Sequence, residues 1–329
     1  DPSEGMFFCA CHFHSNGCAL APQSLAGRGL RFWRLTGLAV QPRSKCMTQL
    51  KFPGGLSEIA GQYDAILCDV WGVIHNGRDA FEEACVALVN FREQGGKVCL
   101  ITNAPVPKQQ VIDYFLPLGV PTDAYDDCVS SGDATREELA KRRDKVFWAM
   151  GANARWERDP YLYQGLNLSF GEPDESDVLL CIGLSDSLKD HPSDYTDTLK
   201  QGVDRNIPMI CANPDKQVRI GGQLHWCAGA LAEIYEDLGG SVIYPGKPHA
   251  AIYDLAVSRV GDAAANKSRV LCIGDSPTTD MRGARIQGFD GLYVGTGLIE
   301  HGADFQAEVS DLLADYGEEA TYAMTGLRW

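Results

Sequence analysis

Short apolar runs separated by helical stretches recur along this chain from Gln62 onward, and they restrict its fold more than any other feature. The runs 65–74 (AILCDVWGVI) and 97–102 (KVCLIT) flank residues 80–93, whose apolar side chains at 81, 85, 88, 89 and 91 form one helical face. Continuous apolar strands between helices are typical of a parallel sheet covered on both faces. The sequence therefore predicts a doubly wound α/β fold. Further strands are expected at 128–131, 145–150, 178–182, 207–212, 241–244, 269–273 and 290–294.

Composition excludes several classes of protein. The 329 residues allow two domains, or one domain with a large insertion, and a hydrophobic fraction of 45% is ordinary for a globular chain. The formal net charge of −15 argues against a nucleic-acid partner, whose phosphates would be repelled. No apolar run approaches about 18 residues, so no membrane span is expected.

The twelve cysteines are not distributed like a disulfide framework. Cys68, Cys99, Cys181, Cys211 and Cys272 each lie inside an apolar run, where a buried reduced thiol is a common core residue. A chain of this length needs no covalent cross-links. We therefore expect a reducing compartment, the cytoplasm.

Residues 1–46 differ from the rest, with five Lys and Arg against two Asp and Glu and no sustained period. They contain Cys9, Cys11, His12, His14 and Cys18, which could supply zinc ligands, although no second pair follows at finger spacing. An acid-poor transit peptide is a second interpretation, without a clear amphipathic helix to support it. We favour the third, a disordered or non-native extension preceding Met47.

Polar side chains stand where four of the predicted segments end or begin. Asp69 lies within an apolar strand, and a buried carboxylate needs a cation or metal to offset its desolvation. Asp275 closes a later strand, and Asp280 falls in the first turn of the next helix, so both can face one crevice. Lys247, between Gly and Pro, is free to point at the same place. Such oxygen ligands suit Mg²⁺.

Four motifs, in this order, resemble the haloacid dehalogenase superfamily, and within it the class IIA branch of NagD-like and p-nitrophenylphosphatase-like hydrolases. They are DVWGV after the first strand, TN after the second, GKPH at 246–249 and IGDSPTTDMRGA at 273–284, with SSGDATREEL at 130–139 and the cap signature NPD at 213–215 between them. The resemblance implies a discontinuous Rossmann-like core, 47–144 and 241–329, interrupted by an α/β cap domain at 145–240.

The resemblance also implies a role for each matching residue. Asp69 would be the nucleophile that forms an aspartyl-phosphate, and Lys247 would neutralise charge on it and on the phosphoryl group. Asp69, the backbone carbonyl of Trp71 and Asp275 would ligate Mg²⁺, with Asp280 orienting the metal site.

The substrate contacts implied by the same resemblance come from two regions. Thr102 and the amide of Asn103 would hold the phosphoryl oxygens. Asn213 and Asp215 of the cap would face the substrate, although an ordinary Asn-Pro-Asp turn explains them equally well. The expected substrate is a small phosphorylated metabolite, and caps of this type often join dimer contacts, which leaves a homodimer open.

The first motif departs from the family pattern, which has a second Asp where this chain has Trp71. An indole N–H does not titrate usefully, so it can be neither general acid nor general base, a function worth roughly 10²–10⁴-fold in rate. His75 is the nearest titratable substitute, although a His before Asn-Gly is more often a turn residue. The second motif, TNAP, lacks the second Asn common in this branch.

Three functions therefore compete. The first is a Mg²⁺-dependent phosphatase, slow on poor leaving groups. The alternative is a phospho-ligand-binding or regulatory protein that has lost turnover. A dinucleotide-dependent oxidoreductase also fits the fold, but no Gly-x-Gly-x-x-Gly follows any strand.

Overall fold

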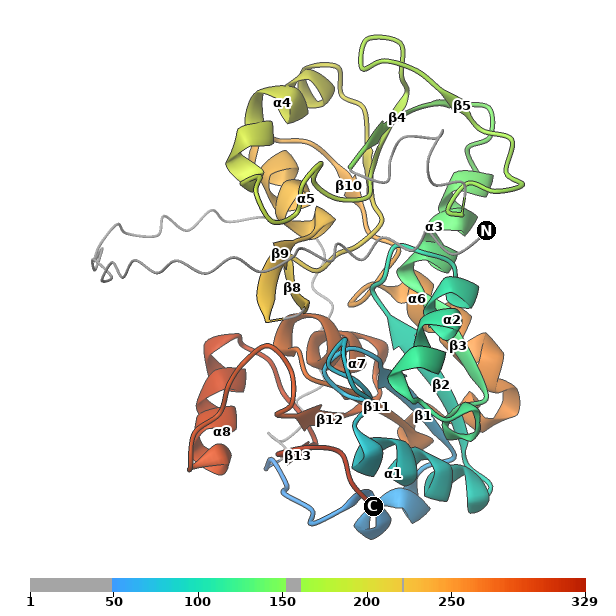
Figure 1. Ribbon diagram of the computed structural model, residues 1–329, viewed down its shortest axis with the longest axis vertical. Helices are drawn as coiled ribbons and strands as arrows, with labels where there is room; N and C mark the ends of the chain where they lie inside the picture. Colours follow the sequence, from blue (N-terminus) through green and yellow to red (C-terminus); the bar gives the residue numbers. More distant parts are fainter. Residues whose placement is uncertain (1–48, 152–160, 221) are drawn as a thin grey trace, which may run out of the picture. The chain divides into compact units, whose positions relative to one another are not determined.

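The computed structural model describes residues 49–151, 161–220 and 222–329 (Figure 1). The cysteine and histidine cluster at 9–18 and the expected extension 1–46 lie outside the described residues. All other predicted strands and site residues fall within them. Within the described residues, no helix has the length and apolar character that crossing a bilayer requires. The expected homodimer and cytoplasmic location stay predictions.

The larger sheet is parallel throughout and has the strand order β13-β12-β11-β1-β2-β3. Its strands are β1 Ala65–Asp69, β2 Lys97–Thr102, β3 Asp127–Ser130, β11 Val270–Gly274, β12 Asp290–Val294 and β13 Tyr322–Met324. The chain proceeds outward from β1 through β2 to β3, then returns to the other side of β1 with β11. The switch in strand order therefore falls between β1 and β11, which is where ligands bind in such sheets.

Alternate side chains of β1 enter two different cores, as the two-residue period of a strand requires. Ile66 and Cys68 pack with helices α1 (Glu82–Glu93) and α2 (Lys108–Leu118) on one face, whereas Ala65 and Leu67 pack with α6 (Ala250–Val260) on the other. Both sets are fully buried, which explains why the strand reads as a continuous apolar run rather than an alternating one. The fold is thus the predicted doubly wound α/β sheet.

Sequence signals for helices can be compared with two of the helices that pack on the larger sheet. The expected helix at 80–93 is α1, and its predicted apolar positions 85, 88 and 91 are buried. Ser130 and Asp133 cap the start of α3 with reciprocal hydrogen bonds, a capping box. The bounds are α1 Glu82–Glu93, α2 Lys108–Leu118, α3 Ser131–Ala140, α6 Ala250–Val260, α7 Arg282–Gln287 and α8 Phe305–Asp315.

A second parallel sheet is formed by the residues between α3 and α6, in the order β10-β7-β6-β4-β5. Its strands are β4 Val146–Met150, β5 Ser169–Phe170, β6 Val178–Cys181, β7 Met209–Cys211 and β10 Val242–Ile243, and its helices are α4 Thr196–Asp204 and α5 Ala228–Asp237. An antiparallel hairpin follows β7, formed by β8 Gln217–Ile220 and β9 Gln223–Trp226. Because β10 pairs with β7, the smaller sheet extends past Gly240; the domain limits themselves stay a prediction.

The first apolar run does not continue as a strand to residue 74. β1 ends at Asp69, because Gly72 adopts a left-handed conformation (φ 82°) and the chain folds back through a bridge between Trp71 and His75. The eight cysteines within the described residues are free and buried, as the sequence indicates for those in strands.

Candidate active site

Three adjacent strands of the larger sheet carry the candidate residues at their carboxyl ends. β1 pairs with both β2 and β11, which lie on either side of it (Figure 1). Asp69 and Thr102 therefore end neighbouring strands, and Asp275 directly follows the third. Asp280 follows Asp275 in a π-helical turn, Pro277–Met281, whose N-cap is Ser276. π-helical turns occur frequently at functional sites. The sheet topology therefore gathers side chains that lie more than 200 residues apart in the sequence.

Asp69, Asp275 and Asp280 form one buried cluster of carboxylates. Their oxygen atoms lie within 4.8 Å of one another, and each residue is buried. Burial, together with the neighbouring carboxylate of Asp280, raises the pKa of Asp69 well above its usual range and that of Asp275 to about 7. Three acids enclosed together are costly unless cations offset their charge, and oxygen ligands of this kind suit Mg²⁺.

Lys247 supplies one cation to the cluster. Its Nζ lies 2.6 Å from Asp69 Oδ1 and 2.7 Å from Asp280 Oδ1, and the residue is only 2% exposed. Burial alone would lower the pKa of Lys247, but the carboxylates of Asp280 and Asp69 raise it above its usual value. One ammonium against three carboxylates leaves two negative charges without a counter-charge. The donor set therefore fits a bound divalent cation.

Two glycines keep the space beside Asp275 free of side chains. A Cβ built on Gly297 would lie 1.6 Å from Asp275 Oδ2, and one on Gly72 would lie 2.6 Å from the same atom. No real Cβ atom approaches an oxygen this closely, so both positions require glycine for the observed packing. Sequence reasoning missed Gly297 as part of the site, because a Gly-Thr-Gly turn after a strand has many structural explanations.

Asn103 links Lys247 to the Asn-Pro-Asp turn after β7. Its Oδ1 accepts a 2.7 Å hydrogen bond from the backbone N–H of Lys247, and its Nδ2 donates to the Lys247 carbonyl at 3.2 Å. The same Nδ2 donates to Asp215 Oδ1 at 2.9 Å. Burial raises the pKa of the Asp215 carboxyl. The side chain of Asn103 therefore positions the backbone of Lys247.

A second contact, which sequence reasoning did not assign, joins the start of α3 to the segment before the Asn-Pro-Asp turn. Ser131 Oγ, at the start of α3, donates to the carbonyl of Ala212 at 2.6 Å. Asn213 is less directly placed, because its Oδ1 accepts from the N–H of Asp215 at 3.1 Å within its own turn. Thr102 is buried, with Oγ1 accepting from the N–H of Ala104 at 3.3 Å.

Trp71 and His75 both lie in the loop that follows Asp69. The Trp71 indole Nε1 is enclosed beside Gly77 and, among the described residues, has no hydrogen-bond acceptor. His75 is buried edge-to-face against Tyr114 and Phe115, and its Nδ1 accepts from the N–H of Gly77 at 3.0 Å. Burial lowers the pKa of His75 to about 4, so it is neutral at physiological pH. These contacts favour the turn interpretation, and we assign no catalytic step to His75.

We expect His75 to make the free energy of unfolding depend on pH between about 4 and 6.5. The unfolded chain binds a proton at the ordinary histidine pKa, whereas the folded chain resists it, so stability falls as the pH drops through this window. Chemical denaturation measures the free energy of unfolding at pH 7.5 and at pH 4.5. Between these two pH values the variant His75→Asn should lose roughly 2–3 kcal/mol less of it than the wild type. Asparagine keeps an acceptor for Gly77 and does not titrate. Equal losses in the two proteins would contradict this pKa.

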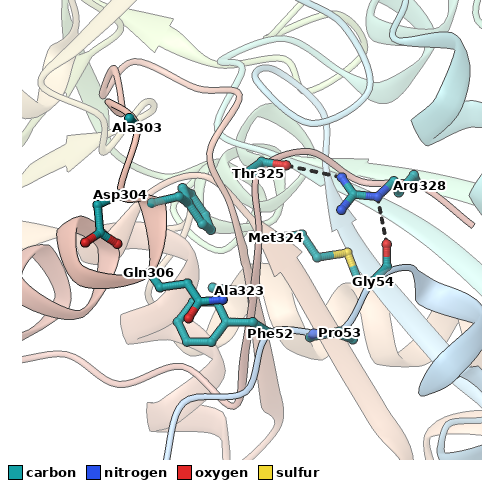
Figure 2. Close-up of a pocket in the computed structure, with 11 residues that line it drawn as sticks. Phe52, Pro53, Gly54, Ala303, Asp304, Gln306, Ala323, Met324, Thr325 and Arg328 are labelled. Atoms are coloured by element: carbon teal, nitrogen blue, oxygen red, sulfur yellow. Dashed lines mark hydrogen bonds between the residues drawn. The ribbon is translucent and has the colours of Figure 1, made fainter.

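A separate pocket of about 430 Å³ lies at the carboxyl end of β13 and the start of α8 (Figure 2). Arg328 donates to the carbonyl of Gly54 at 2.7 Å and to Thr325 Oγ1 at 3.2 Å at its margin. Of the described residues that line this pocket, none belongs to the carboxylate cluster or its neighbours. The pocket is therefore not the candidate active site.

Comparison with known proteins gives two family-model matches, one in each half of the sequence. Residues 66–158 match the family model for haloacid dehalogenase-like hydrolases, and residues 244–319 match a second HAD-hydrolase-like model. These two spans contain Asp69 and Thr102, and Lys247, Asp275 and Asp280, respectively. The chain is also 24% identical over 248 residues to the 5'-nucleotidase YutF of Bacillus subtilis, covering 74% of this chain and 91% of that protein.

Solved structures agree with the family models. A hydrolase of the haloacid dehalogenase-like family from Brucella suis is 40% identical, with a TM-score of 0.74, and the match covers 84% of this chain and all of that one. A p-nitrophenyl phosphatase from Archaeoglobus fulgidus shares the fold at 19% identity, with a TM-score of 0.62 over 80% of this chain and 97% of that one. With the carboxylate cluster and its lysine at the strand ends, these matches show that the chain belongs to the haloacid dehalogenase-like hydrolase family.

Proposed function

We propose that this protein is a Mg²⁺-dependent phosphatase that hydrolyses a small phosphorylated metabolite through an aspartyl-phosphate on Asp69. The observation that carries the proposal is the contact of Lys247 Nζ with both Asp69 and Asp280 inside a cluster of three buried carboxylates. The 5'-nucleotidase and the p-nitrophenyl phosphatase among the similar proteins support a phosphorylated compound as the substrate.

The chain's own residues would prepare Asp69 for attack on phosphorus. Asp69 Oδ1 accepts from the N–H of Val70 at 2.7 Å and contacts Lys247 Nζ, and these two contacts fix the orientation of the carboxylate. Lys247 also favours the ionised form of Asp69, which its burial opposes. Phosphoryl transfer depends mainly on such positioning and charge neutralisation.

Asp69, Asp275 and the backbone carbonyl of Trp71 would hold Mg²⁺, with Asp280 orienting the site. The ion would supply positive charge for the phosphoryl oxygens. Thr102 and the backbone amide of Asn103 would contact the phosphoryl group, since Thr102 ends β2 and Asn103 follows it, next to the end of β1 with Asp69. Asn213 and Asp215 would contribute to substrate recognition, and the hydrogen bond from Asn103 to Asp215 supports the placement of Asp215.

A second candidate function, a phospho-ligand-binding protein without turnover, is favoured by one observation, the indole of Trp71 in place of a titratable acid. Phosphate release from a panel of phosphoesters separates the two. We expect release that requires added Mg²⁺ and stops with a chelator. Binding of phosphorylated ligands without release, together with activity that appears only in Trp71→Asp, would instead identify the binding protein.

A further inference from the structure

The loop that follows Asp69, residues 70–80, is folded tightly on itself. Trp71 and His75 form a bridge, and the N–H of Gly72 donates to the carbonyl of His75 at 2.8 Å. The N–H of Phe81 then donates to the carbonyl of Ile74 at 2.8 Å. These backbone hydrogen bonds hold the loop, and with it the side chains of Trp71 and His75, in one conformation.

No side chain of this loop can give a proton to a departing group at neutral pH. The indole of Trp71 donates hydrogen bonds but keeps its proton. His75 is enclosed against Tyr114 and Phe115, and its Nδ1 accepts a hydrogen bond from the N–H of Gly77. Asp79 is exposed to solvent rather than enclosed with the carboxylate cluster.

The buried carboxyls of the site are already engaged. Asp69 and Asp280 pair with Lys247, and Asp275 belongs to the same cation-binding cluster. Asp215 accepts from Asn103, and it is the one carboxyl of the described site residues outside that cluster. Asp215 is therefore the alternative proton donor that an experiment must test.

We propose that the substrates of this protein are phosphoric anhydrides, above all acyl phosphates, rather than alkyl phosphate monoesters. This inference rests on the proposed function. In the first step an oxygen of Asp69 forms a bond to phosphorus, and the bond from phosphorus to the leaving oxygen breaks. The electron pair departs with a carboxylate, which is a stable anion at neutral pH and needs no proton. An alkoxide leaving group would need one, and the loop offers none.

The second step regenerates Asp69. The oxygen of water forms a bond to phosphorus, the bond from phosphorus to Asp69 breaks, and the electron pair returns to the carboxylate. One proton of the water stays on its oxygen and the other passes to a phosphate oxygen, which gives dihydrogen phosphate. Because no general base assists the water, this step is slow, and the aspartyl-phosphate accumulates during turnover.

The experiment compares kcat/KM for acetyl phosphate, 4-nitrophenyl phosphate, phenyl phosphate and glycerol phosphate, with Asp69→Asn as the blank for spontaneous hydrolysis. We expect the wild type to favour acetyl phosphate over glycerol phosphate by about 10²–10⁴-fold. Trp71→Asp should reduce the ratio of kcat/KM for 4-nitrophenyl phosphate to kcat/KM for phenyl phosphate, two esters of nearly equal size. Trp71→Asn, which has the shape of aspartate but cannot transfer a proton, should leave that ratio unchanged.

Two outcomes would overturn the inference while the proposed function survives. One is Asp69-dependent hydrolysis of glycerol phosphate within tenfold of acetyl phosphate in the wild type. The other is a selective loss of alkyl ester hydrolysis in Asp215→Asn, which would make Asp215 the proton donor. If no substrate of the panel is hydrolysed in an Asp69-dependent manner, the proposed function itself fails. The wild-type ratio decides the matter even where a Trp71 variant does not fold.

Discussion

The variant Asp69→Asn is expected to lose phosphate release on the order of 10⁴–10⁶-fold, because a side-chain amide cannot form the covalent intermediate. Asparagine has nearly the shape of aspartate, so the packing at the end of β1 should persist. Lys247 also keeps its 2.7 Å contact with Asp280. Initial rates with the best substrate of the panel measure the effect.

The fold of this variant should be at least as stable as the wild type. The substitution removes one of three crowded buried carboxylates, and burial and the neighbouring carboxylate of Asp280 raise the pKa of Asp69 itself. Chemical denaturation in the absence of divalent ions provides this control. Retained phosphate release, or a loss of activity that only follows a loss of stability, would remove Asp69 from the role of nucleophile.

The variant Lys247→Met is expected to lower the free energy of unfolding by about 3–5 kcal/mol, because it leaves buried carboxylates without their cation. Lys247 is 2% exposed and contacts Asp69 and Asp280 at 2.6 and 2.7 Å, so solvent cannot replace it. Chemical denaturation with a chelator present isolates this contribution from that of a bound ion. Phosphate release should fall as well, because the charge on Asp69 and the phosphoryl group is no longer neutralised.

The same substitution at Lys216 is the matched control. Lys216 Nζ lies 2.6 Å from Glu233, but both side chains are more than half exposed, so its loss should change stability by less than about 1 kcal/mol. The double variant Lys247→Met, Asp280→Asn should recover part of the stability by removing one uncompensated charge. Similar small effects at Lys216 and Lys247 would contradict the account of the buried ion pair.

Much of the fold could be predicted, because parallel strands buried on both faces carry a strong sequence pattern. The run 97–102 is strand β2 at the predicted bounds, and 290–294 is β12. The strands β5, β8, β9 and β13 were not predicted: polar side chains interrupt β5, β8 and β9, and β13 is a run of only three apolar residues. Trp71 to Ile74 were expected in a strand because they are apolar, yet Gly72 turns the chain away.

The sequence predicts which carboxylates cluster better than it predicts the hydrogen bonds around them. Strand-end carboxylates in an apolar context mark Asp69 and Asp275, and sheet topology brings them together as the parallel strands predict. The link from Asn103 to Asp215 could not be foreseen, because it joins segments of two different sheets through one amide group. His75 was expected as a substitute acid on sequence proximity alone, which says nothing of its burial against Tyr114 and Phe115.

Calorimetric titration of the purified protein with Mg²⁺ tests most directly whether the three aspartates form one ion-binding site. We expect one ion to bind the wild type, and Asp275→Asn to abolish the binding heat, because it removes an oxygen ligand from a cluster within 4.8 Å. Asp254→Asn, an exposed position on α6, should bind as the wild type does. Undiminished Mg²⁺ binding by Asp275→Asn, or none by the wild type, would contradict the central claim.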